Sequence, residues 1–205
     1  MPGMSLHGTD AHRNADGTLP ALVARAVAAA RAHGFPYSCR PEQGRLLRLL
    51  AGGAPRGIAE TGTGCGVGLA WLASGAPPGT RLVSVERDAE RARVARQVFH
   101  DHPEVEILHG DWRRVGEHGP YDLLVLDGGG QAKGDGAADP ARLLTPGGTL
   151  VVDDFTPATA WPPRFDGAPD RPRLHWLEHP ALRATELRLA PDLGVIVGTH
   201  WPRRP

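Results

Sequence analysis

The sequence predicts a doubly wound α/β fold built on one mostly parallel sheet. Short aliphatic runs alternate with segments of helical periodicity between residues 57 and 154, a pattern typical of parallel βαβ units. The run YDLLVLD at 121–127 is almost continuously apolar, as expected for a central strand covered on both faces. A glycine-rich segment, ETGTGCG at 60–66, follows the first predicted strand. These three features indicate an open sheet with a ligand-binding edge.

The first third of the chain is expected to be helical. Residues 1–18 are polar, without the apolar run of a signal peptide, and are expected to form a mobile or loosely packed arm. A helix is predicted over 19–33, where aliphatic residues recur at helical spacing. A second helix begins at Pro41, because proline is favourable in a first turn, and ends at paired glycines. The N-terminal helices, 19–53, thus precede a core over 57–200.

The core alternates strands with helices. Strands are predicted at 57–60, 81–86, 105–109, 121–127, 149–153, 184–189 and 194–200. Helices are predicted at 66–74, 88–100, 139–144 and 173–178. A short loop separates the last two strands, so they form a terminal hairpin, which is antiparallel by construction. No internal repeat is evident, and the 205 residues suit one domain.

The composition narrows the classes of function. The chain carries 23 basic and 23 acidic residues, whereas proteins that bind phosphate backbones usually have a basic excess. Cys39 and Cys65 lack metal-ligand spacing, which disfavours a zinc site and fits a reduced, cytoplasmic setting. No apolar run approaches membrane-spanning length. Nucleic acid and membrane partners are therefore disfavoured.

The segment at 60–66 has the chemistry of a nucleotide-binding turn. Its glycines let the backbone approach a ligand, and the following helix presents free N–H groups. Counting from Gly62, the last position of a dinucleotide fingerprint is Val67 rather than glycine. Taken alone, the segment also fits a packing turn without any ligand.

Acidic residues at the ends of later strands add to the glycine turn. Glu86 ends the second strand, where a carboxylate can accept both ribose hydroxyl hydrogens. Asp111 follows the third strand and can accept from an adenine amino group, and Trp112 can stack on the base. Asp127 ends the fourth strand. Each residue alone fits a solvated strand end or a helix cap, but together they indicate a cofactor site at the carboxyl edge.

Five blocks in order and at family spacing carry a resemblance. They are IAETGTGCG (58–66), LVSVERD (82–88), HGDW (109–112), YDLLVLDGG (121–129) and LLTPGGTLVVDD (143–154). Over about residues 38–200 the sequence resembles the class I S-adenosylmethionine-dependent methyltransferases, in particular the small O-methyltransferases related to catechol and caffeoyl-CoA O-methyltransferases. The resemblance implies a Rossmann-like seven-stranded sheet whose last strand is antiparallel, a small-molecule methyl acceptor, and, in some members, a homodimer.

The resemblance also implies a binding site for S-adenosyl-L-methionine. The residues that would line it are Glu60, Gly62, Thr63, Gly64, Gly66, Glu86, Arg87, Gly110, Asp111, Trp112 and Asp127. Within this set, the glycine turn would face the methionine and ribose, and the residues from Gly110 to Trp112 would surround the adenine.

Metal ligands are implied at three positions. Asp127, Asp153 and Asp154 match the positions where metal-dependent relatives hold a divalent cation, and their hard oxygen ligands suit Mg²⁺ or another such ion. Crowded carboxylates would repel one another without a cation. The alternative is that Asp153 and Asp154 cap the following loop while Asp127 contacts the cofactor.

The catalytic positions depart from the family pattern. Related enzymes have Asp-Asn where this chain has Asp153-Asp154, and a lysine where it has Gly130. The chain's one lysine, Lys133, lies three residues later. Lysine can transfer a proton where arginine cannot, so Lys133 and Asp127 are the candidate catalytic residues. The alternative for Lys133 is a chance surface position.

Several functions stay open at this level. The leading hypothesis is methyl transfer to an oxygen of a small molecule with a divalent metal. A metal-independent transfer to nitrogen, a carboxylate or a peptide is the alternative, as is a cofactor-binding module without catalysis. A nucleic-acid methyltransferase is a minor option because of short arginine clusters. An NAD-dependent oxidoreductase is disfavoured by the missing fingerprint and the missing Tyr-x-x-x-Lys pair. Trp161 is the candidate aromatic facing the acceptor.

Overall fold

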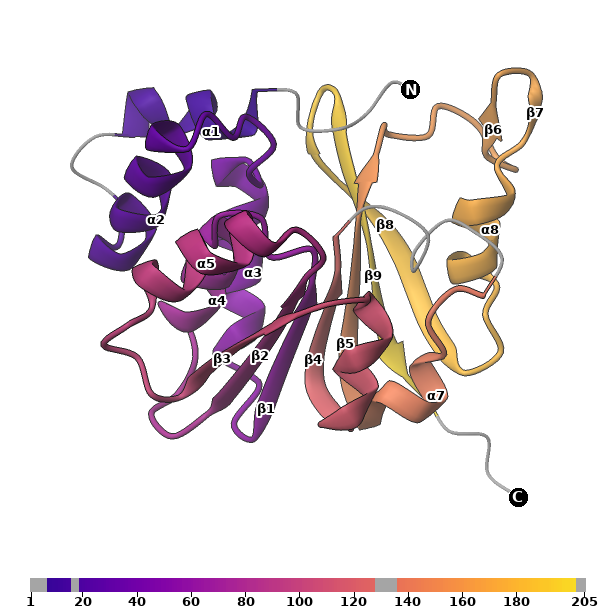
Figure 1. Cartoon of the computed structure of the whole chain (residues 1–205). Helices are drawn as coiled ribbons and strands as arrows, with labels where there is room; N and C mark the ends of the chain where they lie inside the picture. The colour runs from indigo at the N-terminus through magenta and orange to yellow at the C-terminus, as the bar shows by residue number, and fades with distance from the viewer. Residues whose placement is uncertain (1–6, 16–18, 128–135, 202–205) are drawn as a thin grey trace.

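A seven-stranded sheet forms the centre of the molecule (Figure 1). The computed structural model describes residues 7–15, 19–127 and 136–201. The strands, in sheet order, are β3 (Val105–His109), β2 (Arg81–Glu86), β1 (Gly57–Thr61), β4 (Tyr121–Leu126), β5 (Leu144–Phe155), β9 (Leu193–His200) and β8 (Leu182–Ala190). β3 to β5 pair in parallel, whereas β9 runs antiparallel between β5 and β8. The predicted fold class, including the antiparallel last strand, is confirmed.

The longest difference from the predicted strands lies in β5. The prediction covers 149–153, but the strand begins at Leu144, which pairs with Tyr121. The next pair joins Leu123 to Thr149, so the register shifts where Pro146, Gly147 and Gly148 bulge out. Glycine and proline are unfavourable inside a regular strand, and the bulge accommodates both.

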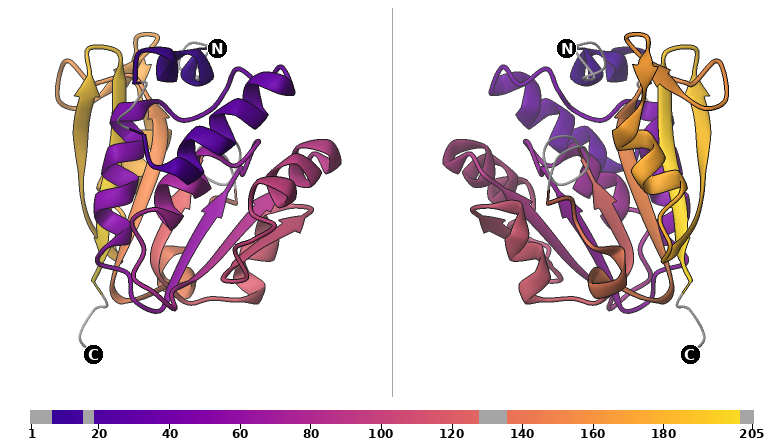
Figure 2. Two further views of the ribbon diagram at one scale, coloured as in Figure 1. Left: turned by 90° about the vertical axis from the view of Figure 1, so that its left-hand side faces the viewer. Right: turned by 90° about the vertical axis from the view of Figure 1, so that its right-hand side faces the viewer.

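Helices cover both faces of the sheet (Figure 2). The longer ones are α2 (Ala21–Ala32), α3 (Pro41–Ala51), α4 (Val67–Ala73), α5 (Ala89–Val98) and α8 (Arg171–Leu177). Shorter elements are α1 (Gly8–Ala11), η1 (His12–Ala15), η2 (Trp112–Glu117), α7 (Pro140–Leu143) and a two-stranded hairpin of β6 (Arg164–Phe165) and β7 (Ala168–Pro169). The predicted long helices are present, each within a few residues of its expected bounds.

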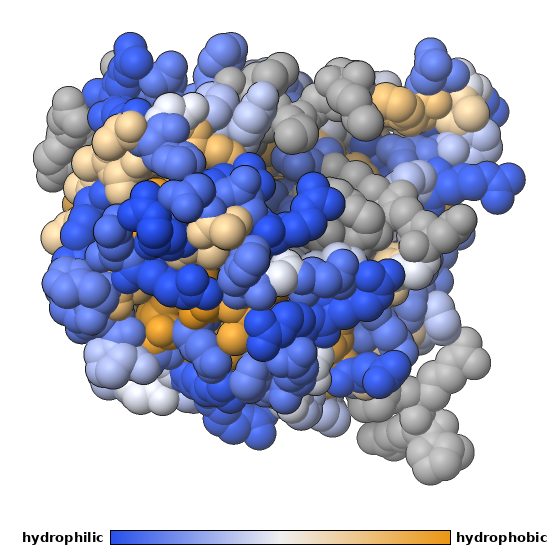
Figure 3. All heavy atoms as spheres, viewed as in Figure 1, coloured by the Kyte–Doolittle hydropathy of each residue, from blue (hydrophilic) through white to orange (hydrophobic). Residues whose placement is uncertain are grey.

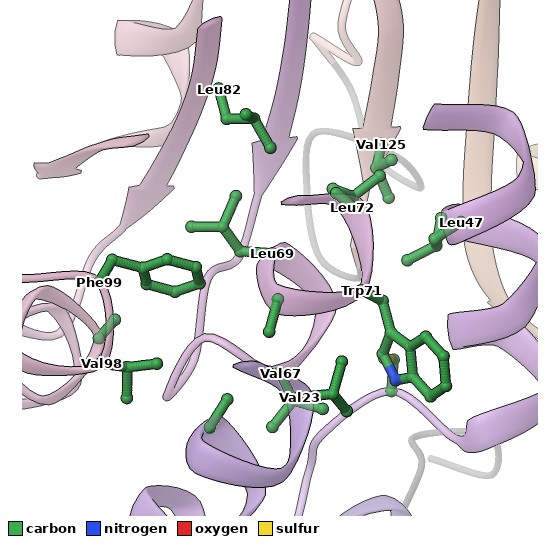
Figure 4. Close-up of a cluster of buried hydrophobic side chains, with 14 of the residues drawn as sticks. Val23, Leu47, Val67, Leu69, Trp71, Leu72, Leu82, Val98, Phe99 and Val125 are labelled. Carbon is green, nitrogen blue, oxygen red and sulfur yellow. The ribbon is translucent and has the colours of Figure 1, made fainter. Parts of the chain in front are cut away.

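The period of two along each strand divides the core between the two faces. One set of strand residues, including Ile58, Leu82 and Val125, packs against α2, α3, α4 and α5. Their neighbours in sequence, such as Ala59 and Val83, face the opposite side with η2, α7 and α8. Figure 4 shows the first cluster, where side chains of α4 lie between the sheet and the N-terminal helices. The central parallel strands are therefore buried on both faces, as such a sheet requires.

Part of the N-terminal segment packs more tightly than an arm. Residues 8–15 form α1 and η1, and both Thr9 and His12 are buried. Thr9 Oγ1 lies 2.6 Å from the carbonyl oxygen of Phe35 and 2.8 Å from Ser38 Oγ. Polar side chains that meet buried partners can hold a polar segment in place, which hydropathy alone does not reveal.

The surface is mostly polar on the face shown in Figure 3. Large apolar side chains that are exposed occur mostly apart from one another along the chain, at Tyr37, Leu49, Trp161, Phe165 and Trp201 among others. Within the described residues, no helix has the length and apolar character needed to cross a membrane.

Candidate active site

The strand register gathers the predicted site residues at one edge of the sheet. Thr61 pairs with Leu126, and Leu126 with Val152, so Gly62, Asp127 and Asp153 take neighbouring places at the carboxyl edge of the sheet. Because side chains alternate along each strand, these residues also point to the same face of the sheet. Glu60, Ser84 and Glu86 share the parity of Ile58 and Leu82, and Asp127 and Asp153 share that of Val125 and Val151, all of which face the N-terminal helices. The site therefore lies where the carboxyl edge meets α3 and α4.

The glycine turn has the backbone that its sequence predicts. Gly62, Gly64 and Gly66 have φ values of 91°, 55° and 94°, in the left-handed region that other residues avoid. A Cβ on Gly62 would lie 3.0 Å from the carbonyl oxygen of Asp127. A Cβ on Gly64 would lie 2.8 Å from the ring of Phe35. Conformation and close packing both require glycine here.

Glu86 holds the glycine turn from the end of β2. Its Oε2 accepts from the backbone N–H of Gly64 at 2.8 Å, and its Oε1 accepts from that of Asp88 at 2.8 Å. Arg91 Nη2 lies 3.0 Å from Oε1, and the Arg91 guanidinium lies over the Phe35 ring, 5.3 Å from its centroid. A carboxylate has about four acceptor positions, so these donors leave capacity for a ligand hydroxyl.

Glu60 is buried beneath the turn. Ser84 Oγ donates to Glu60 Oε2 at 2.8 Å and lies 2.6 Å from Thr63 Oγ1. A Cβ on Gly68 would come within 2.4 Å of Glu60 Oε1. Burial is the largest cause that raises the pKa of Glu60 to about 8, with Asp153 and Glu86 adding to it and Ser84 opposing it. Glu60 therefore holds a proton near neutral pH.

The predicted adenine-side residues lie nearer the solvent. Asp111 caps η2 by accepting from the backbone N–H of Arg113 at 3.0 Å, and it pairs with the Arg113 guanidinium at 3.1 Å. The same guanidinium lies 5.0 Å from the Trp112 ring centroid. Gly110, at φ 151°, directs the chain from β3 into this turn. Arg87, which follows Glu86 in the sequence, is exposed. Asp111 and Trp112 thus both contact the Arg113 guanidinium.

The three aspartates form a cluster at the ends of β4 and β5. One carboxylate oxygen from each of Asp127, Asp153 and Asp154 lies within 4.8 Å of the others. Burial, followed by the charges of Asp153 and Asp154, raises the pKa of Asp127 well above its ordinary value. Asp154 has φ 62°, an uncommon conformation for a residue with a side chain. Converging carboxylates that disfavour one another's ionisation suit a hard divalent cation.

A further residue, absent from the predicted site, contacts this cluster. Gln43 of α3 is buried, and its Nε2 donates to Asp153 Oδ2 at 2.7 Å. The signal that points to it is a polar residue at the spacing of the buried helix face, four before Leu47. Phe35 was missed as well, because it lies in a loop without periodicity.

Two further residues were predicted to belong to the site. Lys133 lies outside the described residues. Trp161 is 70% exposed and follows β5 by several residues.

Comparison with known proteins agrees with the fold. A family model described as a methyltransferase domain matches residues 59–155. A putative O-methyltransferase of Mycobacterium bovis (strain BCG / Pasteur 1173P2) is 32% identical over 165 residues, which are 74% of this chain and 73% of that protein. A putative O-methyltransferase of Mycobacteroides abscessus is 34% identical over 125 residues, and the match spans 55% of this chain and 56% of that relative.

Solved structures show the same architecture. Cofactor-bound Rv0187 from MTB is 28% identical, with a TM-score of 0.75, and the match covers 94% of this chain and 97% of that one. The O-methyltransferase TomG from Streptomyces achromogenes, solved with SAM, has a TM-score of 0.73 at 22% identity and covers 98% and 100% of the two chains. The second likeness speaks for the fold alone.

The fold and the matched family model define a methyltransferase domain. The matched residues, 59–155, include the glycine turn, Glu86, Asp111 and the three aspartates. With its relatives taken into account, the chain belongs to the class I S-adenosylmethionine-dependent O-methyltransferases.

Proposed function

We propose that this enzyme transfers the methyl group of S-adenosyl-L-methionine to an oxygen of a small molecule, with a divalent cation at Asp127, Asp153 and Asp154. The observation that carries the proposal is the convergence of these carboxylates within 4.8 Å at the carboxyl edge, beside the glycine turn. Hard oxygen ligands of this kind favour Mg²⁺ over softer metals.

The cofactor side of the proposal rests on the turn and the strand ends. The backbone at Gly62, Gly64 and Gly66 would lie against the methionine and ribose, because no side chain intervenes there. Glu86, buried and held by backbone N–H groups, would accept from a ribose hydroxyl. Asp111 and Trp112 would flank the adenine. The Arg113 guanidinium, which contacts both residues, would have to move partly away from them.

The acceptor side rests on the aspartate cluster. A bound divalent cation supplies Lewis acidity, which lowers the pKa of a coordinated hydroxyl. The protein's own contribution is to hold the acceptor oxygen in line with the cofactor methyl group and to keep water away. Lys133 is the proposed proton acceptor, and Asp127 would link the cofactor and acceptor halves. Transfer to nitrogen or to a carboxylate without metal is the alternative.

The first experiment measures S-adenosylhomocysteine binding by calorimetry and methyl transfer to a panel of catechols, with and without EDTA. We expect micromolar or tighter binding, and turnover that EDTA abolishes and Mg²⁺ restores. Asp153→Asn should lower turnover strongly, whereas Asp192→Asn, at an exposed ion pair with Arg40, is the matched control and should not.

The outcomes separate the parts of the proposal. A protein that does not bind S-adenosylhomocysteine would contradict the cofactor assignment and all that follows from it. Binding with turnover that EDTA leaves unchanged would contradict only the cation, and would favour the metal-independent alternative.

A further inference from the structure

Gln43 is a buried polar residue in the first turn of α3. It is 1% exposed, although the helix otherwise buries small and aliphatic residues on this face. Its Nε2 donates to Asp153 Oδ2 at 2.7 Å, and Asp153 is itself 2% exposed. Buried side-chain amides need partners, and this amide takes as its partner one member of the aspartate cluster.

Only one orientation of the Gln43 amide suits its contact with Asp153. Asp153 lies beside Asp127 and Asp154, and an ionised carboxylate only accepts hydrogen bonds. The amide nitrogen must face Asp153, since the reverse orientation would place two acceptors together. A donor at this position holds the Asp153 carboxylate in one orientation beside Asp127 and Asp154. Gln43 thus fixes the direction in which Asp153 presents its oxygens to the cluster.

The oxygen of the same amide lacks a hydrogen-bond partner among the described residues. This atom, Gln43 Oε1, is buried. An amide oxygen of this kind is ready to accept from a bound donor. Water held by a divalent cation is such a donor, and the aspartate cluster lies next to this amide.

Close packing between two helices fixes where Gln43 lies. A Cβ on the adjacent Gly44 would come within 2.2 Å of Trp71 Nε1, so α3 approaches α4 at a distance that only glycine permits. Leu47, one turn further along α3, is buried in the same cluster (Figure 4). The Gln43 side chain is therefore carried on a rigid element rather than on a loop.

We propose that Gln43 is a positioning residue that orients Asp153 for cation binding and thereby sets the affinity of the site for a divalent metal. The proposal rests on the cation role proposed above for Asp127, Asp153 and Asp154. Partners that orient metal ligands typically change metal affinity 10–100-fold when they are removed.

The test compares the wild-type chain with Gln43→Met and Gln43→Asn. Methionine keeps the length and volume of the side chain without a donor, and asparagine keeps the amide but shortens its reach. Mn²⁺ binding is followed by the electron paramagnetic resonance signal of the free ion, and S-adenosylhomocysteine binding by calorimetry. Gln97→Met, on the exposed side of α5, is the matched control.

We expect both Gln43 variants to bind Mn²⁺ about 10–100-fold more weakly, with S-adenosylhomocysteine affinity within about threefold of wild type. The shorter variant guards against a folding defect in Gln43→Met, which a thermal melt would reveal. Equal Mn²⁺ affinity in wild type and variants would overturn the role of Gln43 alone. A wild-type chain that binds cofactor product but no Mn²⁺ would overturn the cation proposal, and this inference with it.

Discussion

The backbone N–H of Gly64 donates to Glu86 Oε2 at 2.8 Å, so the glycine turn after β1 is joined to the end of β2 by one carboxylate. The other oxygen of Glu86 meets the N–H of Asp88 and the guanidinium of Arg91. The shape of the turn before any cofactor arrives therefore depends on the charge of Glu86.

Replacing Glu86 with glutamine should weaken cofactor binding. The variant keeps the size of the side chain but loses the charge that holds the Gly64 and Asp88 N–H groups. Hydrogen bonds to a charged group contribute about 1.5–3 kcal/mol each, so S-adenosylhomocysteine affinity should fall at least about tenfold by calorimetry. Glu90→Gln, at an exposed ion pair with Arg93, should bind normally. Unchanged affinity in Glu86→Gln would contradict the role of this carboxylate.

Alanine at Gly66 should destabilise the fold more than alanine at Gly79. The two glycines have similar positive φ values, 94° and 86°, so the backbone strain is shared and amounts to about 1–2 kcal/mol. Only Gly66 is crowded, because its added Cβ would lie 2.9 Å from the Phe99 ring, whereas Gly79 has nothing within 4 Å. Chemical denaturation should show a further loss of about 1–3 kcal/mol in Gly66→Ala. Equal losses would mean that Phe99 moves aside freely.

Glu60 should make the fold less stable as the pH rises. The native state raises its pKa from 4.5 to about 8, so between these values the unfolded chain loses a proton that the native chain keeps. The contribution of Glu60 to the free energy of unfolding is fully present below pH 4.5 and is lost as the pH rises through 8. The slope is at most about 1.4 kcal/mol per pH unit. Relative to wild type, Glu60→Gln should therefore gain stability from pH 5 to 8.5 in urea titrations. A difference between the two proteins that is constant with pH would contradict the raised pKa.

Removing the Arg173 guanidinium, which lies in α8, should lower the thermal stability of the protein. Its guanidinium is 3% exposed and pairs with Asp170 and Glu186, while Nη2 donates to the carbonyl oxygen of Thr156 at 2.8 Å. Arg173→Met leaves these carboxylates without their cation, a change that typically costs about 3–5 kcal/mol. Thermal melts should show a large fall in Tm for Arg173→Met and little change for Arg171→Met, which is exposed. A small fall in Arg173→Met would mean that water replaces the guanidinium.

Much of the sheet could be predicted from sequence because its strands are local apolar runs. The period of two also determines that Glu60, Asp127 and Asp153 face the same helices, since each follows a buried residue two positions earlier. The glycine turn was predictable for the same reason, because backbone conformation at positive φ needs a specific residue type.

The partners of these residues could not be predicted in this way. Gln43 and Asp153 are 110 residues apart in sequence, and nothing local to either one indicates the other. The packing of residues 8–15 likewise depends on Thr9 meeting the loop at Phe35. Such contacts arise from tertiary packing, which periodicity does not encode.

The reversed direction of β9 has a practical consequence for handling the enzyme. His200, its last residue, lies against Leu144 at the start of β5, with Nδ1 3.1 Å from that carbonyl oxygen. The chain therefore leaves the sheet at the edge opposite the aspartates (Figure 1). A linker attached beyond Trp201 would anchor the enzyme to a resin or a sensor surface with the aspartate cluster facing away from that surface.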